Sequence, residues 1–101
     1  MLTACNDAEE ADAIATSLLK RRLAACVNRL EGVVSTYRWK GEIRQDQEIL
    51  LLIKTTEDRF KAMEKVIRRQ HSYELPEILA VRIQDGSQNF LDWLIGEVQD
   101  V

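Results

Sequence analysis

The sequence has little of the residue types that build metal and disulfide frameworks. It contains one histidine and two cysteines among 101 residues, and Cys5 and Cys26 form no C-x-x-C pair. A disulfide scaffold and a zinc ribbon are therefore excluded. Because a closed tetrahedral site needs four ligands, any metal site in this chain is open or shared with carboxylates or other subunits.

Long hydrophobic runs are also absent. No apolar stretch approaches the roughly 18 residues that span a bilayer, and the N-terminus has no basic-then-apolar export signal. The net charge is only −3, from 14 basic and 17 acidic residues mixed along the chain, which is unlike the basic surface of a nucleic-acid-binding protein. These features predict a cytoplasmic protein that binds neither a membrane nor nucleic acid.

What the sequence does contain is enough apolar content for one folded unit. Hydrophobic residues make up 46% of the chain, and a chain of this length buries roughly two thirds of the surface that its unfolded form exposes. No linker, internal repeat or low-complexity segment divides it. We therefore expect a single domain over residues 1–101.

Hydrophobic periodicity predicts alternating strands and helices. The expected elements are a short strand at 2–5, a helix from Asn6 to Arg22, a long hairpin ending at Thr55, a helix to Arg69, a strand at 78–83 and a helix from Ser87 to Val98. This order is typical of the α+β ferredoxin-like split βαβ sandwich, here with a long β-hairpin and a C-terminal helix. Residues 49–53 are all apolar, so both faces of that strand need cover, and we expect a second subunit on the face without helices.

Two side chains are candidate metal ligands. His71 lies in a polar loop, where a neutral imidazole binds transition metals or transfers protons; the alternative is a histidine that only makes hydrogen bonds. Cys5 ends the first strand and offers a thiolate if it is exposed, whereas Cys26 lies in an apolar stretch and is interpreted as structural. No glycine elbow, oxyanion loop or third group to orient the histidine occurs, so we predict that the protein is not an enzyme.

Several stretches of the sequence resemble the CutA divalent-ion tolerance proteins, over nearly the whole chain. The most specific are residues 35–41, followed by Glu48, and residues 71–78. The resemblance implies a ferredoxin-like protomer in a homotrimer, with the long hairpin reaching a neighbour. It also implies a small cytoplasmic protein that takes part in tolerance of copper and other divalent cations, without an enzymatic reaction.

The resemblance also implies where a metal binds. In copper-binding relatives the proposed ligands are a first-strand cysteine and two consecutive histidines. His71 matches the second histidine, whereas the first falls on Gln70 and the cysteine position falls on Leu2. Cys5 lies three residues after Leu2.

We therefore expect a trimeric protein that binds a divalent cation for sequestration or sensing, with His71 and Cys5 as candidate ligands. Imidazole affinity rises toward copper among the first-row divalent ions, which favours Cu²⁺. One alternative is a signalling trimer that holds a small molecule in a cleft between subunits. The candidate cleft residues are Tyr37, Trp39, Lys54, Tyr73 and Glu77. A second alternative is a scaffold for another protein.

Overall fold

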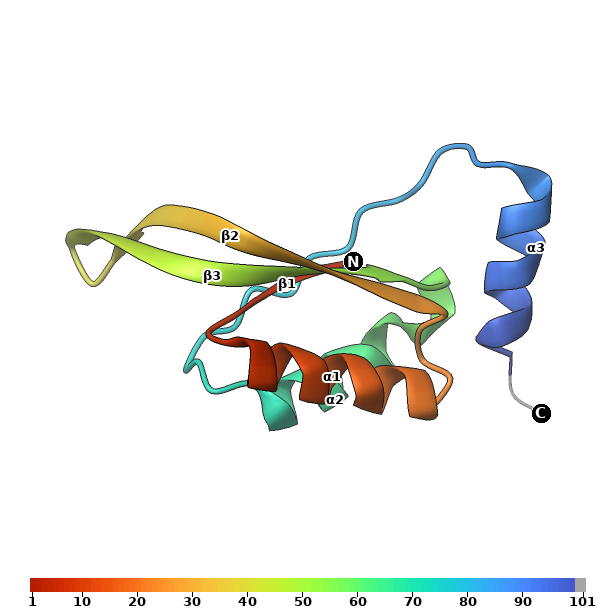
Figure 1. The fold of residues 1–101 in the computed structure, drawn as a ribbon, viewed down its shortest axis with the longest axis horizontal. Helices are drawn as coiled ribbons and strands as arrows, with labels where there is room; N and C mark the ends of the chain where they lie inside the picture. Colours follow the sequence, from red (N-terminus) through yellow and green to blue (C-terminus); the bar gives the residue numbers. More distant parts are fainter. Residues whose placement is uncertain (100–101) are drawn as a thin grey trace.

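The fold places two helices on one face of a three-stranded antiparallel sheet (Figure 1). The computed structural model describes residues 1–99, so residues 100 and 101 of the expected domain lie outside the described part. The elements are β1 (Leu2–Cys5), α1 (Ala8–Lys20), β2 (Cys26–Trp39), β3 (Glu42–Lys54), the 3₁₀ turn η1 (Glu57–Arg59), α2 (Phe60–Gln70) and α3 (Gln88–Glu97). The strand order is β1-β3-β2. Among residues 1–99, no helix is long and apolar enough to cross a membrane.

The start of α1 follows from its capping residues. Asp7 is the N-cap, and its Oδ1 accepts a hydrogen bond from the backbone N–H of Glu10 at 2.8 Å. The Glu10 carboxylate in turn accepts the backbone N–H of Asn6 at 3.0 Å. This reciprocal pair satisfies N–H groups that lack helical partners. It also holds the Glu10 side chain close to the end of β1.

The hairpin of β2 and β3 is shaped by residues with positive φ. Lys40 and Gly41 at the turn have φ values of 50° and 80°, the combination that matches the twist of a two-residue hairpin. Gly32, at φ 74°, lies in the bulge between Leu30 and Val33. The hairpin extends well beyond the two helices (Figure 1).

The core lies between β3 and the helices α1 and α2. On β3, Leu51 and Ile53 are 0% and 2% exposed, whereas Leu50 and Leu52 are half-buried. The fully buried helix residues that complete this core are Ala11, Ile14, Leu18, Met63 and Ile67. The apolar run at 49–53 is therefore dry on its helix-covered face, and its other face is only partly covered within the described chain.

The expected strand at 78–83 is wrong for the described chain. Only Leu79 pairs, with Leu2, through two backbone hydrogen bonds of 2.7 and 3.0 Å. In antiparallel register, each residue after Leu79 lies opposite a position before Leu2, where the described chain offers only Met1. Val81 and Ile83 are accordingly 67% and 61% exposed, and this apolar run has no partner strand within residues 1–99.

Candidate metal centre

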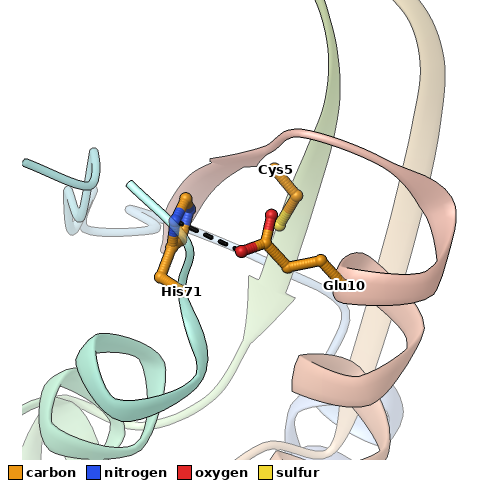
Figure 2. Close-up of side chains that lie close together, drawn as sticks. All are labelled: Cys5, Glu10 and His71. Carbon is orange, nitrogen blue, oxygen red and sulfur yellow. Dashed lines mark ion pairs between the residues drawn. The ribbon is translucent and has the colours of Figure 1, made fainter. Parts of the chain in front are cut away.

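Three potential metal ligands converge where β1 ends, α1 begins and α2 ends (Figure 2). They are Cys5, Glu10 and His71, and their ligand atoms all lie within 4.8 Å of one another. The structure thus brings together the two ligands predicted from the sequence. Glu10 is not among the ligands predicted from the sequence. Its position three residues after the N-cap Asp7 is the signal that fixes its carboxylate at this end of the helix.

His71 is held at both ring nitrogens, and its side chain is 0% exposed. Its Nε2 lies 2.6 Å from the carbonyl oxygen of Ala4, which can only accept a hydrogen bond, so Nε2 carries the ring proton. Nδ1 therefore presents its lone pair and accepts the backbone N–H of Tyr73 at 3.2 Å. The result is a buried, neutral imidazole whose Nδ1 faces Glu10 Oε1 at 3.6 Å.

Glu10 supplies a negative charge beside this ring. Its carboxylate accepts the backbone N–H groups of Asn6 and Ser72. Burial opposes ionisation of this carboxyl, but these hydrogen bonds outweigh burial and lower the pKa of Glu10. Glu10 is therefore ionised at neutral pH, which is the form that binds a cation.

Cys5 is buried, whereas the prediction from the sequence required it to be exposed in order to act as a thiolate ligand. It is 0% exposed in the core beneath α1. Burial, and then the negative charges of Glu10, Glu48 and Asp7, raise the pKa of the Cys5 thiol to about 12. Its sulfur is therefore a protonated thiol at neutral pH, and a metal ion must displace that proton to bind it. Cys26 is only half-buried, at the start of β2.

The spacing of the three side chains fits a three-ligand site after a small contraction. Tetrahedral ligands at bond lengths of about 2.0–2.3 Å lie about 3.5 Å from one another. The separation of 3.6 Å between His71 and Glu10 already matches this value. The widest separation, within 4.8 Å, requires a movement of about 1 Å. Three protein ligands leave a fourth tetrahedral position open.

The five predicted cleft residues do not meet in one chain. Trp39 ends β2 beside the hairpin turn, whereas Lys54 ends β3 at the opposite end of the hairpin. A strand of this length spans about 40 Å. Tyr37 and Tyr73 donate hydrogen bonds to carboxylates of β3, and Glu77 is exposed. A cleft that contains all five therefore needs side chains from more than one chain.

Comparison with known proteins identifies the family. The model for the CutA1 divalent ion tolerance proteins matches residues 1–97. The divalent-cation tolerance protein CutA of Thermus thermophilus is 48% identical over 86 residues, which cover 85% of this chain and 84% of that protein. Protein CutA of Mus musculus is 37% identical over 90 residues, which are 89% of this chain but 51% of that protein. This chain thus matches about half the length of the mouse relative.

The fold leads to the same family. A solved structure of the divalent cation tolerance protein from Thermus thermophilus superposes on this chain with a TM-score of 0.93 at 44% identity. The superposition covers 95% of this chain and 93% of that one. The resemblance read from residues 35–41 and 71–78 and the ferredoxin-like fold class are thereby confirmed. The chain belongs to the CutA1 divalent ion tolerance protein family.

Proposed function

We propose that this chain binds a divalent cation through Cys5, Glu10 and His71, with Cu²⁺ preferred. The observation that carries this proposal is the convergence of three ligand types, from three separate elements, within 4.8 Å. Imidazole and thiolate ligands suit copper, and the affinity of such sites for divalent ions peaks at Cu²⁺. The role that follows is sequestration or sensing of the ion, without catalysis. Membership of the divalent ion tolerance family agrees with this role.

The proposed assembly is a homotrimer. An apolar hollow of about 770 Å³ is lined by residues of β1, β3, the segment 80–83 and α3. Val81 and Ile83 in that segment are exposed, and their backbone groups are available to a strand from a second copy. Exposed apolar surface of this kind is typical of subunit interfaces. The number of subunits, three, is taken from the family resemblance.

The metal site is tested by titrating Cu²⁺ into the full chain by calorimetry, with a weak competing chelator to suppress adventitious binding. We expect saturable binding in a whole-number ratio to subunits, with weaker binding of Zn²⁺ and Mn²⁺. His71→Ala should lose this binding, and circular dichroism will show whether that variant is folded.

The matched control is Cys26→Ala, which removes the thiol outside the cluster and should bind Cu²⁺ as the wild type does. Cys5→Ala, which removes the thiol inside it, should weaken binding. Equal binding by the wild type and His71→Ala, or no binding by either, would contradict the proposal.

One observation favours a second candidate function, the binding of a small anionic molecule between subunits. Lys54 lines the apolar hollow, with its Nζ 5.9 Å from the ring centroid of Phe90. A cation on an apolar wall suits an organic anion. A thermal-shift panel separates the two functions, because stabilisation by nucleotides or organic anions without a response to Cu²⁺ would favour this candidate.

The cytoplasm is the location that we propose for the protein. Cys5 and Cys26 are both free cysteines, and a reducing compartment keeps thiols in this form. Oxidation of the Cys5 thiol in an oxidising compartment would oppose the metal chemistry proposed above. Cell fractionation of the source organism tests this location directly.

A further inference from the structure

The backbone N–H groups that follow His71 are hydrogen-bonded to two of the atoms that would coordinate a metal ion. His71 Nδ1 accepts the N–H of Tyr73 at 3.2 Å, and Glu10 Oε1 accepts the N–H of Ser72. A neutral imidazole has one in-plane lone pair on its unprotonated nitrogen. Nδ1 therefore cannot accept this hydrogen bond and coordinate a metal at the same time. We call residues 72–73 the strap, because they cover the site in this way.

Coordination of a metal ion through the other ring nitrogen of His71, Nε2, would cost more than coordination through Nδ1. Nε2 of His71 carries the ring proton and donates it to Ala4 at 2.6 Å. Coordination through Nε2 would require loss of that bond, together with a shift of the ring proton to Nδ1, which already faces the N–H of Tyr73. Binding through Nδ1 breaks only the longer bond of 3.2 Å. The strap is therefore the competitor that a metal ion displaces at least cost.

The strap is fastened by the side chain of Tyr73. Its hydroxyl donates a hydrogen bond to Glu48 on β3 at 2.8 Å. Its ring lies 4.7 Å from the His71 ring, centroid to centroid. A phenol hydroxyl is protonated at neutral pH, so it remains a hydrogen-bond donor there. A single side chain thus holds the strap both to the sheet and to the ligand ring.

We propose that Tyr73 is a positioning residue that sets the metal affinity of the site. With its hydroxyl on Glu48, the strap covers Nδ1 and the Glu10 carboxylate, and a metal ion binds only as the strap lifts. This inference rests on the proposed function of the Cys5, Glu10 and His71 cluster. Removing the hydroxyl loosens the strap without touching a ligand, and should tighten Cu²⁺ binding by up to about five-fold, the factor that one typical net hydrogen bond contributes.

The test compares two tyrosine variants in the full chain. Tyr73→Phe removes the fastening and keeps the ring against His71. The matched control is Tyr37→Phe, which removes a hydroxyl that likewise donates to a β3 carboxylate, Asp46. Both residues of this control pair lie in the part of the hairpin between the bulge and the turn, away from the cluster. Calorimetric titration with Cu²⁺ should give tighter binding for Tyr73→Phe and wild-type affinity for Tyr37→Phe.

A second measurement reports on the strap itself. Hydrogen exchange by mass spectrometry should show faster exchange of the Tyr73 amide when Cu²⁺ is added to the wild type, since the metal takes the only lone pair of His71 Nδ1, its acceptor. A strap that does not compete with the metal ion predicts no such change. Circular dichroism confirms that both variants are folded.

The outcomes separate this inference from the metal site on which it rests. If the wild type binds Cu²⁺ but Tyr73→Phe binds it equally or more weakly, or the Tyr73 amide stays protected on binding, the strap does not compete and the metal site stands. If neither the wild type nor Tyr73→Phe binds Cu²⁺, both the site and the strap proposal are wrong.

Discussion

The run at 49–53 is apolar toward both sides of the sheet, but the chain covers the two sides differently. On the helix-covered side, Leu51 and Ile53 are 0% and 2% exposed. On the side of the C-terminal segment, Val81 and Ile83 are more than half exposed, and α3 stands apart from α1 and α2 (Figure 1). This difference shows that hydrophobicity predicts which side chains should be buried, but not whether the same chain or another one buries them.

The end of α3 is held by two arginine hydrogen bonds, beside the buried side chains of Leu94 and Val98. Arg22 donates to the carbonyl oxygen of Glu97 at 3.3 Å, and Arg59 donates to that of Val98. These bonds satisfy carbonyl groups that the last helical turn leaves without partners. The helix is thus anchored at its C-terminal end, beside the apolar hollow.

The largest expected effect is on assembly. Ile83→Asp places a charge on the open side, and burying an unpaired carboxylate in an interface is strongly unfavourable. We expect sedimentation to show a trimer for the wild type and the protomer mass of 11.6 kDa for Ile83→Asp. Ala62→Glu, which adds a charge to an exposed position of α2, should leave the trimer intact. A wild type that sediments as a monomer would refute the trimer.

The next effect concerns the helix-covered side. Leu51→Ala leaves a cavity at a fully buried position, and should lower the free energy of unfolding by about 3 kcal/mol. Leu19→Ala removes the same atoms from a side chain that is 43% exposed on α1. This substitution should change the free energy of unfolding by less than about 0.5 kcal/mol. Urea denaturation at one protomer concentration measures both values. Similar losses in the two variants would mean that Leu51 is not in a dry core.

Local patterns in the sequence predict most of this fold. The capping pair of Asp7 and Glu10 defines the start of α1, and the β-rich residues on either side of Lys40-Gly41 define the hairpin. The strand at 78–83 could not be judged in this way, because a strand forms only where a partner is in register. That partner is set by the position of Leu2 and by any second chain, and neither is encoded in the apolar run itself.

The candidate metal site is likewise predicted only in part from the sequence. The chemistry of Cys5 and His71 marks them as ligands in the sequence. Their burial depends on the packing of α1 and α2 over β1, which joins residues far apart in the chain, so the sequence could not show that the Cys5 thiol is enclosed or that His71 bonds to Ala4. Glu10 is an acidic residue of the first turn of α1, which marks the start of a helix but not a metal ligand.

The smallest effect that we expect tests how dry the helix-covered side is around Cys5 in the metal-free protein. Burial raises the pKa of this thiol from its ordinary value of 9.0 to about 12. The folded protein therefore keeps a proton that the unfolded chain loses as the pH rises past its ordinary pKa. This contribution to stability is complete below the unfolded pKa and is lost as the pH rises through the folded one. Stability should fall with pH between these two values.

Urea denaturation at about pH 8 and about pH 10.5 separates the Cys5 contribution from that of other groups. The free energy of unfolding should fall more steeply in the wild type than in Cys5→Ala, which has no thiol to shield at this position. Cys26→Ala keeps the buried thiol and should retain the wild-type slope. Equal slopes in the wild type and Cys5→Ala would mean that water reaches Cys5. The helix-covered side would then be open at the metal cluster even though it is closed at Leu51, and the contrast between the two sides of the sheet would hold only away from the site.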